Sequence, residues 1–308
     1  MAPSPLHQAP SRAGGAQPGS GRRALPRLLG ILVISLLGGC RNEQPPQELI
    51  QLRGVTDPLL RANRIRTSPI RFTLEAGETA GYWAGQMGLC RPMPSAPPPG
   101  ADPFQDCEAW NHVAPDDAAS PLQRQVNRLA YLLGTASART YPQGLISFDR
   151  SFFLVQGHDN SALRCVVAHE LTHFLQRHAY LSSRREQQDD FRGLRAAGQT
   201  RLLASLSQEQ ELAADRGALL MTAIAGHDPA ACIQQLQQAA ELDGDYAGDD
   251  PAATHPGHQR RIAAARAYLR QGLRHDLEAW RHHPPAPAVA PRWRWESSDR
   301  LLTVLTGP

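Results

Sequence analysis

The feature that most constrains this chain is residues 169–173, whose sequence is His-Glu-Leu-Thr-His, a His-Glu-x-x-His motif. On an α-helix, residues four apart share one face, so His169 and His173 can each give a ring nitrogen to the same zinc ion. Glu170 projects about 100° around the helix from His169, where its carboxylate can act on a water molecule at the metal. Two imidazoles leave a zinc ion short of ligands, so a further ligand must come from elsewhere in the chain. The alternative is a chance match in a helix that contains histidine.

The sequence around the motif predicts a buried helix. No Pro or Gly occurs from residue 162 to residue 180, Asp159 and Asn160 are candidate N-caps, and Gly157 interrupts the preceding segment. Apolar residues occur on much of the circumference, at Leu163, Val166, Val167, Leu171, Phe174 and Leu175. Burying two imidazoles and a carboxylate among them is costly without partners, and a metal ion supplies such a partner.

A second predicted helix carries the candidate for the third ligand. We expect this helix to begin at Ser207 and to end before Gly226. Glu211 is the candidate ligand. Asp215 lies on the same face, four residues later, where it can accept a hydrogen bond from a ligating imidazole. The alternative is a solvated helix face, which fits the two alanines between Glu211 and Asp215 poorly.

Together these segments resemble the M48 family of zinc metallopeptidases. The resemblance rests on the His-Glu-x-x-His motif and on a Glu-x-x-Ala-Asp segment that begins 38 residues after His173. Two further segments agree with it, Gly-His-Asp-Pro-Ala at residues 226–230 and His-Pro-Gly-His-Gln-Arg-Arg-Ile at residues 255–262. The resemblance extends over roughly residues 144–269, and the combined motifs are more specific than any of them alone.

The resemblance implies one Zn²⁺ per chain, bound by His169, His173 and Glu211, with Glu170 as the general base. It implies that Asp215 supports a ligating histidine. It also implies that His255 stabilises the tetrahedral intermediate of peptide hydrolysis, and that Arg261 positions the site.

The chain departs from the family pattern just upstream of the motif. The sequence Ala-Arg-Thr-Tyr-Pro at residues 138–142 stands where the family usually has Asn-Ala-Phe before an edge strand, and little room remains upstream for the usual sheet. Spacing also separates the chain from the metzincin class of zinc peptidases. That class requires Gly at position 176 and His at position 179, where this chain has Gln176 and Ala179, and His178 lies one residue short.

The predicted fold is α+β and mostly helical: a zincin-like (gluzincin) metallopeptidase domain with a small sheet whose edge strand lies beside the motif helix. Residues 144–149 predict a short strand, which residues 151–155 either continue or follow as a turn. Such a strand could hold an extended substrate at the sheet edge, or be an ordinary core strand. Residues 71–75 alternate like a further strand, and residues 121–136 predict an amphipathic packing helix.

Residues 1–39 predict a lipoprotein signal peptide, with Cys40 as the lipidated residue. The apolar stretch from Leu28 to Leu37 is short for a membrane span and is followed by Gly-Gly-Cys, which resembles a bacterial lipobox. An ordinary signal peptide, or a membrane anchor with an incidental cysteine, is the alternative. Because Arg41 rather than Asp follows the cysteine, we expect a lipid-anchored protein of the cell envelope, at the outer membrane and facing the periplasm.

The remaining domain limits follow from composition. Residues 41–120 form an N-terminal region with a Pro-rich loop, residues 121–283 the zinc peptidase domain, and residues 284–308 a Pro/Ala linker and a terminal strand. Cys90 and Cys107 bracket the Pro-rich loop, so they form either a disulfide or two separate thiols.

A second cysteine pair depends on how the helices pack. Cys165 lies on the motif helix and Cys232 on the helix predicted to begin after residue 228. The two can bond only if their Cα atoms come within about 7 Å.

Composition excludes two kinds of chemistry. The 32 basic residues are all Arg, so no lysine is present to form a Schiff base or to act as a general base. Residues 1–40 hold four arginines and no acid, so their removal lowers the formal net charge from +3 to −1. Nothing in this charge favours nucleic acid binding.

The expected function is a zinc-dependent endopeptidase that hydrolyses envelope or misfolded proteins at the periplasmic face of the membrane. Its expected partners are unfolded or envelope protein substrates and the membrane, through the lipid anchor. The alternative is a non-catalytic or weakly catalytic lipoprotein that acts as a chaperone or scaffold in outer-membrane protein assembly. Glu170 favours the enzyme, because a structural zinc site has no need of that carboxylate.

Overall fold

The computed structural model describes residues 44–66, 69–77, 79–90, 105–113, 120–157, 159–242, 253, 255–287 and 290–306. The predicted signal peptide with Cys40 and the Pro-rich stretch at residues 92–103 lie outside these residues. The chain from Glu43 onward forms one unit. No helix in the described part of the chain is both long and apolar enough to cross a membrane.

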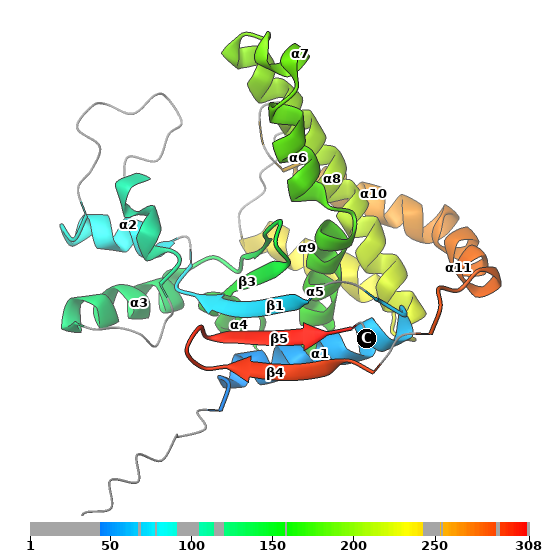
Figure 1. Ribbon diagram of the computed structural model, residues 1–308, viewed down its shortest axis with the longest axis horizontal. Coiled ribbons are helices and arrows are strands. Elements are labelled where there is room, and N and C mark those ends of the chain that lie inside the picture. The colour runs from blue at the N-terminus through cyan, green and yellow to red at the C-terminus, as the bar shows by residue number, and fades with distance from the viewer. Residues whose placement is uncertain are drawn as a thin grey trace, which may run out of the picture. The chain divides into compact units, whose positions relative to one another are not determined.

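The described residues form one mixed sheet beside a larger set of helices (Figure 1). Its strands, in the order β2-β3-β1-β5-β4, are β2 (Ala138–Thr140), β3 (Leu145–Asp149), β1 (Ile70–Glu75), β5 (Leu301–Leu305) and β4 (Arg292–Glu296). The pair β1–β3 is parallel, and the other neighbouring pairs are antiparallel. The prediction of a mostly helical α+β fold with a small sheet is confirmed.

Eleven α-helices and one 3₁₀ helix accompany the sheet in the described residues. They are α1 (Gln47–Ala62), α2 (Thr79–Gln86), η1 (Gln105–Trp110), α3 (Pro121–Leu133), α4 (Arg150–Gln156), α5 (Asn160–Leu175), α6 (His178–Glu186), α7 (Asp189–Arg192), α8 (Ala196–Ile224), α9 (Ala230–Leu242), α10 (His258–Gln271) and α11 (Leu273–His282).

One face of the sheet makes the main core. Along β1, the side chains of Ile70, Phe72 and Leu74 are buried, and they alternate with partly exposed ones, as expected of a strand with one covered face. Phe72 lies opposite Ile146 of β3 and Leu302 of β5 in the register of the sheet. These residues pack in one cluster with apolar side chains of α1, α4, α5 and α8.

The structure decides between the two roles considered for the strand at residues 144–149, and it corrects the prediction for residues 151–155. The strand at residues 145–149 is interior, between β1 and β2, so the edge strand is β2, at the residues that replace the usual family segment. Residues 151–155 are helical in α4 rather than extended. The hydroxyl of Ser151 donates to the carbonyl of Thr135 at 2.6 Å, and one short helix buries both Phe152 and Phe153.

Two helices have limits that differ from the sequence pattern. The motif helix α5 begins after Asp159, whose side chain accepts from two backbone amides, but it ends at Leu175 rather than continuing to residue 180. Arg177 has a φ of 57°, in the left-handed region, and this break separates α5 from α6. Helix α8 begins at Ala196 and not at Ser207, so residues 196–206 form its first part.

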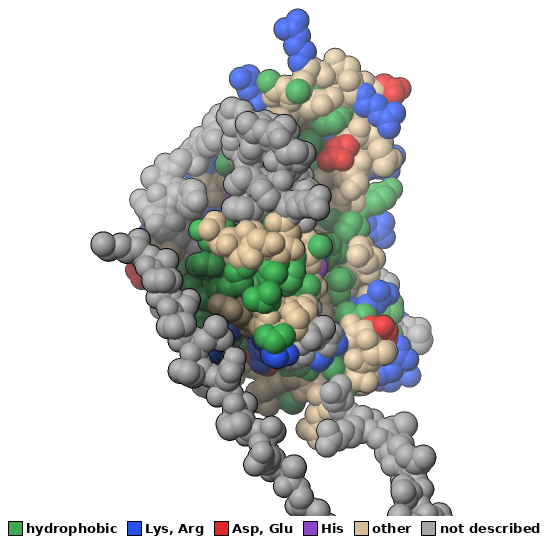
Figure 2. Space-filling view, turned by 90° about the vertical axis from the view of Figure 1, so that its left-hand side faces the viewer, with side chains coloured by type: hydrophobic (Ala, Val, Ile, Leu, Met, Phe, Trp, Pro, Cys, Tyr) green, Lys and Arg blue, Asp and Glu red, His purple; other side chains and the backbone are tan. Residues whose placement is uncertain are grey.

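The predicted packing helix α3 buries less than expected. Val126 is buried, but Leu122, Leu132 and Leu133 are exposed. Seen from the side on which α2 and α3 lie, apolar side chains gather near the centre of the face (Figure 2).

The domain limits expected at residues 121 and 283 are not boundaries of the fold. Strand β1 comes from the predicted N-terminal region, and β4 and β5 from the predicted tail, yet all three belong to the same sheet as β2 and β3. Little room for the sheet was expected upstream of the motif, and the sheet is instead assembled from strands on both sides of it in the chain.

Both cysteine pairs considered in the sequence are disulfides. Cys90 bonds to Cys107, with Cα atoms 5.4 Å apart, and Cys165 bonds to Cys232, with Cα atoms 5.1 Å apart. The second bridge ties the motif helix α5 to α9, and both of its cysteines are buried in a second apolar cluster.

We expect the replacement of both Cys165 and Cys232 by Ala to lower the free energy of unfolding by about 4 kcal/mol, because this bridge spans 67 residues. Replacing Cys90 and Cys107, which are 17 residues apart, should lower it by about 3 kcal/mol. Urea unfolding of the oxidised proteins measures both values, and peptide mapping without reduction checks the pairing. Four free thiols, or wild-type stability in both double variants, would contradict this account.

Candidate metal centre

The site forms where α5 and α8 cross closely. A Cβ atom placed on Gly217 of α8 would overlap the side chain of Thr172 on α5, so only glycine allows this approach. Thr172 in turn donates from its hydroxyl to the carbonyl of Ala168 at 2.8 Å. The close crossing brings the motif face of α5 against the polar part of α8.

The side chains of α8 that face inward follow helical spacing. Buried residues recur every three or four positions, at Ala204, Gln208, Glu211, Asp215, Ala218 and Thr222. Glu211 and Asp215 lie in the middle of this stripe, and their side chains are only 9% and 5% exposed. Buried carboxylates require partners, and both of them find partners on α5 and α10.

Three ligand atoms face one point. Nε2 of His169 lies 3.0 Å from Nε2 of His173, and each nitrogen lies 3.4 Å from a carboxylate oxygen of Glu211. Two ligands of a tetrahedral zinc ion, each about 2.0–2.1 Å from the metal, are about 3.3 Å apart. The spacing and the nitrogen and oxygen chemistry of this group therefore fit a zinc ion.

Asp215 fixes the orientation of His169. Its Oδ1 lies 3.0 Å from Nδ1 of His169, and it accepts two hydrogen bonds from Arg261, at 2.7 and 2.9 Å. Burial raises the pKa of Asp215, but the charge and the hydrogen bonds of Arg261 outweigh burial and hold it well below its usual range. The ionised carboxylate keeps the proton of His169 on Nδ1, which leaves Nε2 for a metal.

The surrounding charges favour a cation in the site. Burial lowers the pKa of His169, but the carboxylates of Asp215 and Glu211 outweigh it and raise the value to about 10. Burial raises the pKa of Glu211, yet its bonds to His169 and His173 and the charge of Arg261 bring it well below its usual range. Glu211 is thus ionised near pH 7, as a ligand must be.

Glu170 borders these ligand atoms and has its own partner. The hydroxyl of Thr140, on the edge strand β2, lies 2.7 Å from Oε2 of Glu170 and 2.9 Å from its carbonyl oxygen. This contact restricts the rotation of the Glu170 side chain and ties the edge strand to the motif helix. Sequence reasoning missed Thr140, because nothing in its local sequence indicates that β2 lies beside α5.

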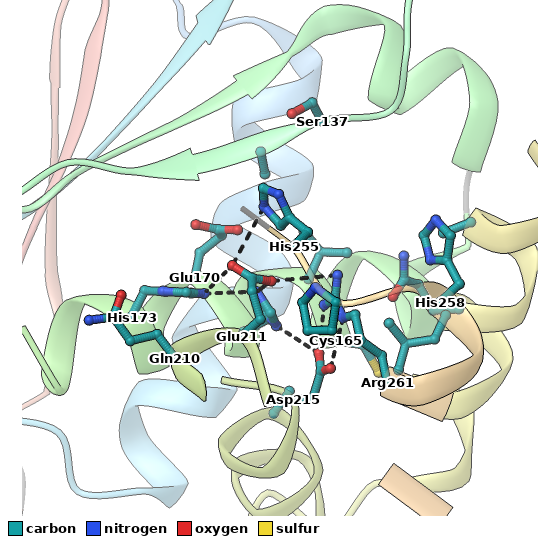
Figure 3. A pocket seen from close by; sticks show the side chains of 18 of the residues that line it. Ser137, Cys165, Glu170, His173, Gln210, Glu211, Asp215, His255, His258 and Arg261 are labelled. Atoms are coloured by element: carbon teal, nitrogen blue, oxygen red, sulfur yellow. Dashed lines mark hydrogen bonds and ion pairs between the residues drawn. The ribbon is translucent and has the colours of Figure 1, made fainter. Parts of the chain in front are cut away.

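His255 precedes α10, and its side chain is 65% exposed. Its Nε2 lies 3.6 Å from Oε1 of Glu211, and Figure 3 shows its ring directed toward Glu170 and Glu211. The segment leading to it is held by Gln208 of α8, whose amide donates to the carbonyl of Ala253 at 2.9 Å.

All seven predicted residues of the site line one cleft of about 840 Å³: His169, Glu170, His173, Glu211, Asp215, His255 and Arg261. The cleft is bordered by β2 with the segment before it, and by α5, α8, α9 and the start of α10.

His178 is a polar partner of the site that sequence reasoning did not identify. Its Nε2 lies 2.9 Å from Oε1 of Gln176, an acceptor, so this nitrogen carries the hydrogen. Its Nδ1 lies 3.0 Å from Nδ1 of His173 and accepts from it. Burial, and then the neighbouring His173, lowers the pKa of His178 to about 4, so its ring is neutral near pH 7.

The position of His178 depends on the break between α5 and α6. On an unbroken helix, His178 would project about 140° away from His173. The left-handed residue Arg177 turns the chain so that the two rings meet. His178 thereby holds His173 in the tautomer whose Nε2 faces Glu211 and His169, just as Asp215 does for His169.

We expect His178→Ala to weaken zinc affinity by about 10–100-fold, because His173 loses the acceptor that fixes its tautomer. His178→Gln should keep most of the affinity, since a side-chain oxygen can accept the same hydrogen bond. Competition with a chromogenic chelator measures this, and His275→Ala, a change at an exposed histidine on α11, is the control. Equal zinc affinity in the His178→Ala and His275→Ala proteins would show that His178 does not support the site.

The comparisons with known proteins agree with this geometry. A sequence model of peptidase family M48, a family of zinc metallopeptidases, matches residues 139–269, from β2 to the later part of α10. Neither the comparison with curated proteins nor the comparison with solved structures found a match. The matched range holds the three ligand candidates, Glu170, Asp215 and Arg261. This part of the chain therefore matches peptidase family M48, and its sheet is completed by β1, β4 and β5 from outside the matched range.

Proposed function

We propose that this protein is a zinc-dependent endopeptidase, in which His169, His173 and Glu211 hold the metal and Glu170 is the general base. The observation that carries the proposal is the convergence of two imidazole nitrogens and a buried carboxylate on one point, with a second carboxylate beside them. Three protein ligands leave a fourth position of a tetrahedral zinc ion open, as catalytic zinc sites require.

The edge strand supports binding of an extended peptide. Tyr141 donates to the carbonyl of Leu145 at 2.8 Å, and Asp149 donates to that of Ser137 at 3.0 Å, so the odd-numbered residues of this segment face β3. In an antiparallel pair the backbone groups of alternate residues point the other way, which directs those of Ala138 and Thr140 toward the open edge. A substrate main chain can add there as a further strand, beside the ligand atoms.

A zinc ion in this site supplies a Lewis acid that polarises the substrate carbonyl and lowers the pKa of a water molecule. Glu170 removes a proton from the attacking water and passes it to the amine that leaves. Thr140 keeps the Glu170 carboxylate directed into the cleft through the 2.7 Å contact. His255 is placed to donate to the oxygen that gains negative charge, and Arg261 holds Asp215 and Glu211 in position.

The alternative function, a non-catalytic scaffold, does not account for Glu170. A structural zinc site is closed by four protein ligands and needs no carboxylate beside the open position. Glu170 is 7% exposed and held by Thr140, so the chain maintains a buried carboxylate that only the enzyme uses.

We further propose that the substrates are unfolded or envelope proteins and that the enzyme is lipid-anchored through Cys40 at the outer membrane, facing the periplasm. The lipobox-like sequence before Cys40 supports the anchor. The two disulfides support an oxidising compartment, because such bonds persist outside the reducing cytosol.

We expect Glu170→Gln to keep zinc while the rate of casein cleavage falls by about 10²–10⁴-fold, because only the base is lost. Glu211→Gln should lose zinc and activity together, since it removes a ligand. Metal content by mass spectrometry and cleavage of labelled casein separate the two cases. Glu209→Gln, an exposed change on the same helix, is the matched control and should alter neither measurement. Unchanged turnover in Glu170→Gln would refute the proposed function.

A further inference from the structure

A second cavity, of about 450 Å³, borders the metal cleft on the other side of Thr140. Thr140, His173 and Ala179 line both cavities, so the two are contiguous. The second cavity lies past the carboxyl end of β2, between the turn at residues 141–142, the end of α5 and the start of α6. An extended peptide that binds along β2 therefore passes the ligand atoms and reaches this cavity with a nearby residue.

Among the described residues, arginines are the charged side chains that line the second cavity. Arg66 and Arg177 line it, and no Asp or Glu does so among the described residues. Neither guanidinium forms an ion pair or a side-chain hydrogen bond within the described part of the chain, whereas Arg61, Arg150 and Arg261 each pair with a carboxylate.

The two arginines are brought together from distant parts of the chain. Arg66 follows α1, and Arg177 is the left-handed residue between α5 and α6. A non-glycine residue in the left-handed region carries a conformational cost, and here that residue is an arginine at the rim of a cavity next to the metal centre. Tyr141, Phe174 and Tyr180 supply apolar and aromatic walls.

We infer that this second cavity binds a carboxylate of the substrate, close to the scissile bond. Guanidinium groups bind carboxylates through paired charged hydrogen bonds, and within the described residues neither Arg66 nor Arg177 is paired with a carboxylate. The same charges disfavour a basic residue at this position. The inference rests on the proposed endopeptidase function, since it concerns the substrate of that site.

The carboxylate can belong to a side chain of the substrate or to its chain terminus. The direction in which the peptide runs along β2 decides which of the two can reach the cavity. A peptide antiparallel to β2 places residues from the amino side of the scissile bond in the cavity, so the carboxylate is an Asp or Glu side chain. A peptide parallel to β2 places the carboxyl side there, and the carboxylate can then also be the chain terminus. The experiment needs one arm for each source.

The test measures binding without cleavage, with the Glu170→Gln protein. Fluorescein-labelled ten-residue peptides of one neutral sequence carry a single Glu at each position in turn, and a matched set carries Gln instead. A further pair differs only in having a free or an amidated carboxyl terminus. Fluorescence polarisation gives the affinities for proteins that also carry Arg66→Gln, Arg177→Gln or both. Arg184→Gln, at an exposed arginine of α6 outside the cavity, is the control.

We expect Glu peptides to bind about tenfold more tightly than Gln peptides at one or two positions, because a charged hydrogen bond is gained. The preference should shrink in each single variant, vanish in the double variant and persist with Arg184→Gln. If only the free terminus gives the preference, the terminal carboxylate is the ligand. A preference that is absent, or that survives in the double variant, would overturn the inference.

The failure of the proposed function would look different. A wild-type protein that binds Glu peptides preferentially but never cleaves them contradicts the endopeptidase and leaves the carboxylate cavity standing. If the wild-type protein cleaves Glu and Gln peptides with the same kcat/KM, and the two peptides also bind with the same affinity, only the carboxylate cavity is contradicted.

Discussion

The contact on which the rest of the site depends is the one that Asp215 makes with His169 and Arg261. It joins α5, α8 and α10 through a single buried carboxylate, with bonds of 2.7–3.0 Å to both partners. A buried charge is tolerated only when it is paired and fully hydrogen-bonded, so the loss of Arg261 would leave Asp215 with an uncompensated charge. The same carboxylate turns His169 so that Nε2 meets His173 and Glu211. One interaction therefore links the packing of three helices to the geometry of the ligand atoms.

The two histidines of the motif are oriented by unlike groups. His169 is held by an ionised carboxylate and His173 by the neutral ring of His178, which in turn donates to Gln176. Only the first arrangement adds negative charge next to the three ligand candidates. The backbone break at Arg177 makes the second arrangement and also places an arginine at the second cavity. The left-handed residue Arg177 thus contributes both to the candidate metal centre and to the cavity proposed to bind substrate.

The sequence predicted the chemistry of the site better than the limits of its elements. The motif, Glu211 and Asp215 could be recognised because each belongs to a short segment of sequence. Within such a segment, helical spacing and the family resemblance can be read directly. The start of α8 was misplaced, because the capping pattern at Ser207 also fits inside a long helix. Thr140 and His178 were missed, since their roles come from a strand pairing and from a helix break that no local pattern reveals. The pairing of β1 with β5, between residues about 230 apart in the chain, was equally hidden.

The measurement that tests the central claim most directly is zinc K-edge X-ray absorption on the purified protein. The account predicts one zinc ion per chain with two imidazole nitrogens at about 2.0–2.1 Å, carboxylate oxygen at about 2.0–2.2 Å and no sulfur. The imidazole scattering should disappear from the spectrum when both His169 and His173 are replaced by Ala. A sulfur shell at about 2.3 Å, or a zinc spectrum that is unchanged in that double variant, would place the metal elsewhere and contradict the account.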